Sequence, residues 1–508
     1  MTSVRRLGLW SAGPALVIVL ACSACFGEVV KGHEGIETKV LAVFATLKSN
    51  YYNKPWKSPD FRVVRGSGFF FRDEKTFPDK SGLILTNAHG VTQAQTIEVS
   101  NGREKRRYKA DVVGICNSAD FAVLQMQPEE FALYERRNGR VVPLELGDSD
   151  TLRVGDKVQG WGYPTGGQRI SKSDQGEISR IEVSGYVYSK DLWLMVQASL
   201  QQNRGNSGGP VLKDNKVVGI SFQGIMASDR INYFIPINLV KSLLPILDRQ
   251  ELIPKWRFRA RYMFPRLKSY YGLGPEQGGI LLEYLIPHGG PYNFGLRSND
   301  ILTEIDGHAV DDFGDIYFGP LDQKIYFLEI LNRKRVGDPL QVKVIRNGGP
   351  LEIKGSVTPG LQRLVPRVFT TANYFIFGGV AFVELTDNAI SDMGKPGQSL
   401  REKYLDEYPE KPDQKIVVVA EIFPEYGLLS AEDFRRRVEK IEDVEILNIA
   451  HLYRVIEQFR KEGKKKALLG LSSHHRLPLD IEGAARLDET IQKKYGILYM
   501  KTPGEFHK

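Results

Sequence analysis

Short runs of β-branched and aromatic residues, each ended by Gly, Asp or Asn, dominate the chain from about residue 36 to residue 250. Such runs predict antiparallel strands, and their close spacing is typical of two packed barrels. The apolar positions from residue 239 to residue 247 follow a helical pattern, so we expect a closing helix there. The clearest strand-like runs are residues 66–71, 83–86, 121–124 and 217–220.

The C-terminal half contains a weak internal repeat of one small β-rich module. In the first copy, a strand-like run at 279–285 is followed by a hairpin at 300–310 about an Asp-Gly turn. In the second copy, a similar run at 415–420 is followed by a hairpin at 437–446. A helical pattern continues from residue 449. We therefore expect two modules, at residues 255–360 and 365–505, after a first domain at residues 36–250.

The N-terminus has the pattern of an export signal. Arg5 and Arg6 precede an apolar run at 7–21 that is short for a membrane span, and small residues follow it. We therefore expect a signal peptide at residues 1–27 and an exported, periplasmic protein. Cys22 stands in a sequence similar to a lipoprotein box, so a lipid-anchored or extracellular protein is an open alternative.

Composition narrows the function classes. A length of 508 residues predicts about three domains. The net charge of +8 is spread along the chain, which argues against a nucleic-acid partner, and the basic run at 103–109 is expected to be a solvated hairpin. Cys116 is the one cysteine outside the leader and is expected to pack in a core. His474 and His475 are expected in a surface loop, and no metal or other cofactor is expected.

The residues with the strongest chemical signal are in the segment 205–210, Gly-Asn-Ser-Gly-Gly-Pro. Its glycines allow a tight turn that would aim the N–H groups of Gly205 and Ser207 at one oxyanion. His89 offers a base for Ser207, and Asp120 offers a carboxylate to orient that base. The chain order His, Asp, Ser is that of the two-barrel serine proteases, so these three residues are predicted to be catalytic.

This part of the chain resembles the protease domain of the HtrA/Deg family, close to its plant-type branch. Two departures are Gly90, where the family usually has valine, and Arg204, where it usually has proline; neither removes a catalytic group. A further string at 374–382 resembles the divergent C-terminal PDZ domain of plant-type Deg proteins. The matching stretches of the protease domain are residues 66–69, 85–89, 120–124, 160–164, 205–210, 218–223 and 233–237.

The resemblance implies a fold, a mechanism and a substrate class. The fold is mainly β: a chymotrypsin-like double β-barrel protease domain followed by two PDZ-like α+β domains. The backbone N–H groups of Gly205 and Ser207, together with that of Asn206, would form the oxyanion hole. The specificity pocket would be lined by Ile220, Ser221, Phe222 and Gln223, which carry no carboxylate, so small or medium apolar side chains are expected before the cleaved bond.

PDZ domains hold a peptide C-terminus by strand addition and a glycine-containing loop. By alignment that loop lies at residues 258–263, where Tyr262 replaces the glycine and Arg259 and Arg261 could attract a carboxylate. An exposed basic linker is the alternative interpretation of this segment.

The resemblance also implies polypeptide substrates in an unfolded state and a trimer-based homo-oligomer. Tyr51, Tyr52 and Trp56 are candidate contacts between subunits. Two alternatives stay open: a chaperone or peptide-binding scaffold without proteolysis, and a protease whose resting site needs activation.

Overall fold

A computed structural model describes residues 35–201, 203–224, 232–405, 407–427 and 435–502. The expected signal peptide and the possible lipid anchor at Cys22 lie outside these residues. In the described part, each helix is too short or too polar to span a membrane.

The first domain begins with a closed barrel in the strand order β1–β2–β3–β6–β5–β4. Strand β3 is buried throughout and β6 at all positions except Gln125, which agrees with their nearly continuous apolar sequences. Helix α1 (Pro128–Asn138) follows, with proline in its first turn and Gly139 at its end. The strands are β1 (Val40–Ser49), β2 (Asp60–Phe70), β3 (Leu83–Thr86), β4 (Ala94–Ser100), β5 (Tyr108–Cys116) and β6 (Phe121–Met126).

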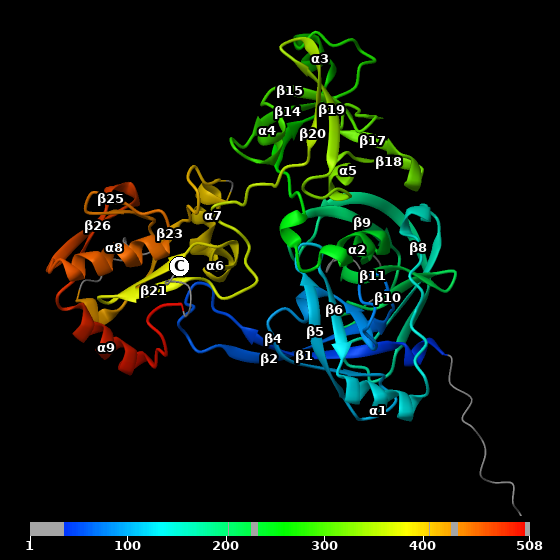
Figure 1. The fold of residues 1–508 in the computed structure, drawn as a ribbon, viewed down its shortest axis with the longest axis horizontal. Coiled ribbons are helices and arrows are strands. Elements are labelled where there is room, and N and C mark those ends of the chain that lie inside the picture. Colours follow the sequence, from blue (N-terminus) through cyan, green and yellow to red (C-terminus); the bar gives the residue numbers. More distant parts are fainter. Residues whose placement is uncertain (1–34, 202, 225–231, 406, 428–434, 503–508) are drawn as a thin grey trace, which may run out of the picture.

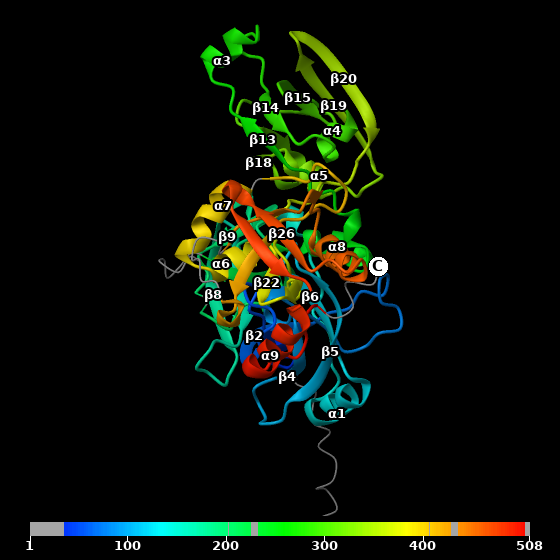
Figure 2. The same cartoon turned by 90° about the vertical axis from the view of Figure 1, so that its left-hand side faces the viewer.

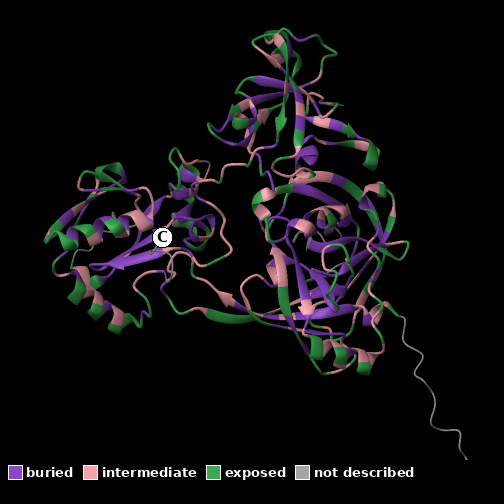
Figure 3. Cartoon of the chain, in the orientation of Figure 1, coloured by how far each residue is buried: buried purple, intermediate pink, exposed green. Residues whose placement is uncertain are grey.

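A second closed barrel packs beside the first, in the order β10–β11–β12–β9–β8–β7 (Figure 1). The predicted closing helix is confirmed as α2 (Ile237–Leu243), which continues as a 3₁₀ turn to Ile246. One apolar core runs through both barrels and includes buried residues of α2 (Figure 3). The strands are β7 (Lys157–Gly162), β8 (Ser171–Gly185), β9 (Leu192–Ala198), β10 (Pro210–Lys213), β11 (Lys216–Gly224) and β12 (Asn232–Pro236).

The middle module has a sheet in the order β13–β14–β15–β19–β20, with β16 paired to β15 and a separate β17–β18 hairpin. The predicted Asp-Gly turn is confirmed, because Asp306 and Gly307 both have positive φ where β15 turns into β16. The strands are β13 (Phe258–Arg261), β14 (Ile280–Leu285), β15 (Asp300–Ile305), β16 (His308–Ala309), β17 (Asp315–Phe318), β18 (Gln323–Tyr326), β19 (Pro339–Arg346) and β20 (Gly349–Ser356). The helices are α3 (Pro265–Tyr270), α4 (Gly290–Phe294) and α5 (Leu328–Asn332).

The C-terminal module has two sheets, in the orders β21–β22–β23 and β25–β24–β26–β27. The expected second hairpin is present as β24 and β25, and Asn448 caps the helix that follows it. The strands are β21 (Tyr374–Phe377), β22 (Val380–Glu384), β23 (Val417–Ile422), β24 (Val438–Ile441), β25 (Val444–Glu445), β26 (Lys466–Leu471) and β27 (Arg476–Asp480). The helices are α6 (Asp387–Asp392), α7 (Gln398–Tyr404), α8 (Ile449–Lys461) and α9 (Ala484–Tyr495).

A charged contact joins the middle module to the second barrel. Arg333, just after α5, donates two hydrogen bonds to Asp150 of the barrel, at 2.7 and 2.8 Å. The same guanidinium donates to Glu329 at 2.8 Å. Burial raises the pKa of Glu329 to about 7, although Arg333 opposes the rise. An ion pair between Arg333 and Asp150 therefore connects the middle module to the barrel. The carboxyl group of Glu329, which also accepts from Arg333, is buried.

The hairpin between β1 and β2 reaches away from its barrel and contacts the C-terminal module (Figures 1 and 2). At its tip, Trp56 is 7% exposed. Its ring centroid lies 6.0 Å from that of Tyr374 and 6.3 Å from that of Phe423. Lys54 pairs with Glu421 at 2.7 Å. The hairpin thus becomes part of the core of a module that follows it much later in the sequence.

The expected role of this hairpin in oligomer contacts is wrong for Trp56, which packs in the core of its own chain. The backbone N–H of Tyr52 donates to Asp392 of α6 at 2.9 Å. Tyr51 lies at the surface.

Trp56→Ala should release the C-terminal module from the hairpin, because the smaller alanine side chain leaves a cavity among the aromatic rings. We expect the substitution to lower the free energy of unfolding by about 3 kcal/mol. Thermal unfolding followed by circular dichroism, with limited proteolysis of the linker, measures the change. Lys57→Ala, an exposed position on the same hairpin, should behave as the unsubstituted chain; equal melting temperatures for the two variants would contradict the contact.

Candidate active site

His89 and Asp120 are brought together by two paired strands of the first barrel. His89 lies in the 3₁₀ turn Ala88–Gly90 that follows β3, and Asp120 immediately precedes β6, which pairs with β3. The Nδ1 atom of His89 lies 2.8 Å from Oδ2 of Asp120, and the backbone N–H of His89 donates to Oδ1 at 2.9 Å. Both carboxylate oxygens therefore hold the same histidine, which leaves its Nε2 as the nitrogen that can take a proton.

The surroundings favour the charged form of the imidazole. Burial alone would lower the pKa of His89, but the charge of Asp120 and the hydrogen bond to it outweigh burial and raise that pKa above 6.5. The Asp120 side chain is 1% exposed, whereas that of His89 is 35% exposed. Because the pKa of His89 is higher in the folded chain than in the unfolded one, the pair contributes its full stabilisation below pH 6.5. This stabilisation is lost as the pH rises through the folded-state pKa.

The turn that carries Ser207 depends on glycine at two positions. Gly205 and Gly208 have φ values of +98° and +89°, in the left-handed region that other residues rarely adopt. A Cβ atom at Gly208 would lie 2.0 Å from the carbonyl oxygen of Ser67, and one at Gly205 would lie 2.6 Å from that of Tyr163. The close approach of neighbouring backbone therefore excludes any side chain at either position.

Ser67, a fully buried residue of β2, joins this turn to the first barrel. Its N–H donates to the carbonyl of Ser207 at 2.7 Å, and its hydroxyl donates to the carbonyl of Gly205 at 2.7 Å. The same hydroxyl accepts from the N–H of Tyr163 at 2.8 Å, and Thr86 donates to the Ser67 carbonyl at 2.7 Å. Sequence reasoning gave Ser67 no role; the available signal was a serine between two glycines in an otherwise bulky strand.

The hydroxyl of Ser207 points to the second barrel in this structure. It donates to the carbonyl of Phe222 in β11 at 3.2 Å. The backbone N–H of Asn206 donates to Asn203 at 3.1 Å, so the expected contribution of Asn206 to an oxyanion hole is wrong for this conformation. The side-chain Oδ1 of Asn206 is buried with no hydrogen-bond partner among the described residues.

Three of the four residues expected to line the specificity pocket are buried. Ile220, Ser221 and Phe222 are 0%, 2% and 4% exposed. Ile220 and Phe222 belong to the common core of the barrels, where the ring of Phe222 lies 4.7 Å from that of Tyr186. Gln223 lies in β11, but its side chain is outside the described set.

A segment from the C-terminal part of the chain reaches the neighbourhood of His89. The ring of Tyr188 meets the His89 ring edge-on at 5.9 Å, and the centroid of the Phe369 ring lies 5.0 Å from that of Tyr188. The carbonyl of Phe369 accepts from Gln93 at 2.6 Å, and Tyr188 donates to Asn117 at 3.1 Å. Sequence reasoning could not find this contact, because Phe369 is far from the other residues in the chain.

The segment expected to be a carboxylate-binding loop is instead a strand. Residues Phe258–Arg261 form β13, an edge strand that pairs with β14. Arg261 forms an ion pair with Glu283. Tyr262 is 49% exposed and packs edge-on against Phe313. Of the three residues predicted for that loop, only Arg259 lines the cavity described next.

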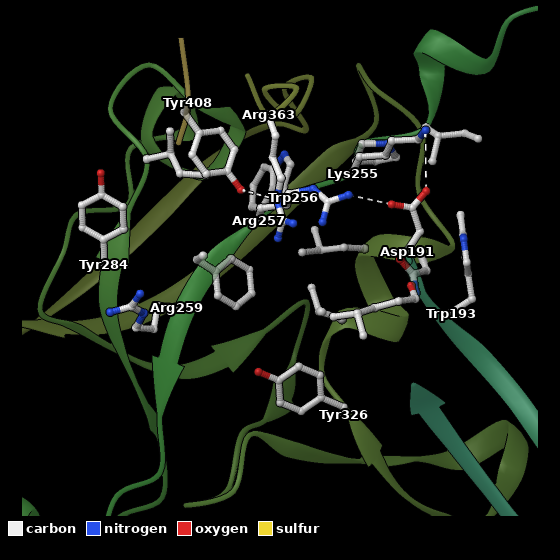
Figure 4. Close-up of a pocket in the computed structure, with 18 residues that line it drawn as sticks. Asp191, Trp193, Lys255, Trp256, Arg257, Arg259, Tyr284, Tyr326, Arg363 and Tyr408 are labelled. Carbon is white, nitrogen blue, oxygen red and sulfur yellow. Dashed lines mark hydrogen bonds and ion pairs between the residues drawn. The ribbon is translucent and has the colours of Figure 1, made fainter. Parts of the chain in front are cut away.

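A cavity of about 340 Å³ lies between β13 and α5 of the middle module and extends to the second barrel (Figure 4). Lys255, Arg257 and Arg259 line it, together with Asp191 of the barrel. Asp191 pairs with Arg257 at 2.6 Å and lies 3.8 Å from Lys255. It also accepts from Ser118 at 2.6 Å. The carboxylate of Asp191 thus occupies the end of the cavity at which Lys255 and Arg257 lie.

Cys116 is buried, as expected, and burial raises its pKa to about 11, so its thiol is protonated and unreactive. His474 ends the 3₁₀ turn Ser472–His474. Among the described residues, no group of three or more His, Cys, Asp or Glu side chains is placed to hold a metal ion.

Comparison with known families identifies two regions. A family described as a trypsin-like peptidase domain matches residues 66–220, and a family described as a PDZ domain matches residues 366–503. The first match contains His89, Asp120 and Ser207.

Several proteins are similar along most of their length. Protease Do-like 4, mitochondrial, of Arabidopsis thaliana is 29% identical over 82% of this chain and 76% of its own. Protease Do-like 2, chloroplastic, of the same plant is 26% identical over 90% of this chain and 74% of its own. A periplasmic DegP-like serine endoprotease of Halomonas elongata is 29% identical over 56% of this chain and 54% of its own.

Among solved structures, the HtrA-type protease AlgW with a tripeptide is 24% identical, with a TM-score of 0.47 over 63% of this chain and 94% of its own.

The titration of His89 tests the geometry of the pair. In NMR spectra of histidine-labelled protein, His89 should titrate above 6.5, because Asp120 holds the imidazolium. In Asp120→Asn only the opposing effect of burial remains, so the pKa should fall below 6.5. His451, whose pKa is lowered by burial and by Arg454, should titrate below 6.5 in both proteins. An unchanged His89 pKa in Asp120→Asn would contradict the pairing.

Proposed function

We propose that this chain, a serine endopeptidase of the HtrA/Do-like protease family, cleaves unfolded or damaged polypeptides in protein quality control. The observation that carries the proposal is the joint placement of three groups. A doubly hydrogen-bonded His89–Asp120 pair lies on the barrel to which Ser67 fastens the Ser207 turn. We assign the catalytic triad to His89, Asp120 and Ser207 on this basis.

The mechanism follows from the chemistry of these groups. His89 takes the proton of Ser207 as the hydroxyl attacks the peptide carbonyl, while Asp120 holds the imidazole tautomer and stabilises the imidazolium. The backbone N–H groups of Gly205 and Ser207 then hold the oxyanion, and loss of one such donor typically costs about 3 kcal/mol. His89 protonates the leaving amine, and water hydrolyses the acyl-enzyme. Because the base must be neutral, cleavage should rise with pH through the raised pKa of His89.

We further propose that this conformation is a resting state. The Ser207 hydroxyl donates to the Phe222 carbonyl, and the side chains expected to line the pocket are buried. Activity then requires rotation of Ser207 toward His89 and opening of β11.

We assign residues 36–250 to the protease domain, 255–360 to a first PDZ module and 365–505 to a divergent second one. The edge strand β13 and the cavity beside it support peptide binding by strand addition in the first module. Lys255, Arg257 and Arg259 would attract a peptide carboxylate, in competition with Asp191.

From the sequence at residues 1–27 we propose that the protein is exported to the periplasm. An exported protein with a lipid anchor at Cys22 is the alternative. The periplasmic relative from Halomonas elongata supports this location, whereas the plant relatives are mitochondrial or chloroplastic. A trimer-based homo-oligomer is proposed from the family resemblance alone.

Ser207→Ala should abolish cleavage of casein and leave the melting temperature unchanged, because only the nucleophile is lost. His89→Ala should lower the rate by about 10⁴-fold or more. Ser269→Ala, at an exposed serine of α3, is the matched control and should cleave normally. Casein turnover by purified Ser207→Ala would exclude the assignment, whereas an unsubstituted chain that binds casein without cleaving it would favour a chaperone or scaffold.

Cleavage-site profiling by mass spectrometry tests the specificity. The sequence 220–223 lacks a carboxylate that could bind a cation, so Val, Ala, Ile or Leu should precede the cleaved bond. A profile dominated by Lys or Arg would reject the pocket assigned to β11.

A further inference from the structure

A short segment at the start of the C-terminal module bonds to the first barrel beside His89. We name residues 366–369, Pro-Arg-Val-Phe, the strap. The strap lies in the connection between β20 and β21. At its end, the carbonyl of Phe369 accepts a hydrogen bond from the side chain of Gln93 at 2.6 Å. The strap therefore links the C-terminal module directly to the part of the barrel that carries His89.

The other three strap residues are held at the start of α6, on the side of the C-terminal module that faces the barrels (Figure 1). The N–H of Asp387 donates to the carbonyl of Pro366 at 3.0 Å, and its carboxylate accepts from Arg367 at 2.9 Å. The N–H of Val368 donates to the side chain of Asn388 at 2.8 Å. Because three consecutive residues have fixed partners, the fourth is held in place relative to α6.

Gln93 joins the strap to the turn that carries His89. It has a φ of +64°, in the left-handed region that residues with a Cβ atom rarely adopt. Its side-chain oxygen accepts from Asn50 at 2.6 Å, while its side-chain nitrogen donates to Phe369. Asn50 lies in the hairpin between β1 and β2, which packs on the C-terminal module. A strained residue persists where its surroundings hold it, and here the hairpin and the strap both do so.

The ring of Phe369 reaches His89 through Tyr188. The centroid of the Tyr188 ring lies 5.0 Å from that of Phe369 and 5.9 Å from that of His89. The hydroxyl of Tyr188 donates to Oδ1 of Asn117 at 3.1 Å. The same oxygen lies 2.7 Å from the hydroxyl of Thr92, in the turn that follows His89. Tyr188 is therefore connected to the histidine by its ring and to the adjoining turn by its hydroxyl.

The hydrogen bond between Nδ1 and Asp120 does not by itself fix the plane of the His89 ring. The imidazole could turn about that bond and move its Nε2 away from the nucleophile. The edge of the Tyr188 ring opposes this turn. Phe369 contacts both supports of the histidine, because its ring meets Tyr188 and its carbonyl meets the side chain of Gln93.

We propose that Phe369 is a positioning residue for the catalytic base. It acts through Tyr188 and Gln93, and it makes the orientation of His89 depend on the C-terminal module. The proposal rests on the assignment of His89 as the base in the proposed function. A strap that moves away from the barrel removes both supports at once and leaves the base misplaced.

Phe369→Ala removes the ring and tests the proposal by kinetics on a fluorogenic peptide. The full chain with this substitution should have a kcat about tenfold lower and a KM within about twofold of the parent. A small displacement of the base slows the chemical step without weakening substrate binding. Phe369→Tyr keeps the ring and should keep the parental kcat. Phe264→Ala, at a phenylalanine of the middle module that is 58% exposed, is the matched control and should change neither constant.

Two further measurements do not depend on proteolysis, and both use chains that carry Ser207→Ala. In NMR spectra of histidine-labelled protein, Phe369→Ala should shift the ring resonances of His89, because its edge contact with Tyr188 changes. Amide exchange at Thr92, whose N–H donates to the carbonyl of Ala88 at 2.8 Å, should become about tenfold faster.

A second variant covers the case in which Phe369→Ala does not fold. Gln93→Asn keeps a residue that tolerates the left-handed φ, but its shorter side chain does not reach the carbonyl of Phe369. It should produce the same changes in the His89 resonances, in the exchange at Thr92 and in kcat.

Unchanged His89 resonances and unchanged exchange in a folded Phe369→Ala or in Gln93→Asn overturn the proposal. A raised KM at unchanged kcat also overturns it, because Phe369 would then act in substrate binding. An equal loss of kcat in Phe264→Ala or Phe369→Tyr assigns the loss to general destabilisation and likewise overturns it. If Ser207→Ala still cleaves casein, the proposed function fails, whereas the NMR and exchange results still decide whether the strap holds His89.

Discussion

The placement of the candidate catalytic groups depends on the buried hydrogen bonds of Ser67. A double barrel divides its functional groups between two domains, and each domain could shift against the other. Ser67 belongs to the first barrel, yet its backbone and hydroxyl hold the carbonyls of Ser207 and Gly205 and the N–H of Tyr163, all in the second. Because an unmet polar group at a buried site is costly, any sliding of the barrels would break several bonds at once. The glycine at position 208 follows from the same constraint, since a Cβ atom there would lie 2.0 Å from the carbonyl oxygen of Ser67.

Several other parts of the molecule also make contacts within the same chain. Asp191 takes the basic end of the cavity in the middle module, and Phe369 backs Tyr188 beside His89. Residues 500–502 pair with the outer edge of β21. The Ser207 hydroxyl likewise bonds within the chain, to the carbonyl of Phe222.

Local patterns predicted local structure well. The Asp-Gly turn, the closing helix and the buried Cys116 follow from short-range rules, and the fold class follows from the spacing of strands and the order of His89, Asp120 and Ser207. The loop predicted by family resemblance at Phe258–Arg261 is wrong, because the alternating apolar and basic residues there form a strand with one side partly buried. The packing of the hairpin on the C-terminal module could not be predicted, because no short-range sequence pattern indicates which distant surface Trp56 packs against.

The docked hairpin links the fold to the order of synthesis. Tyr52 and its partner Asp392 are 340 positions apart, and the aromatic rings around Trp56 come from the same late module. While the ribosome completes the barrels and the middle module, the hairpin tip already exists but its packing surface does not. An apolar tip is therefore exposed on every nascent chain until translation is nearly complete. A chain released early would lack the surface on which Trp56 packs and would keep that aromatic side chain exposed.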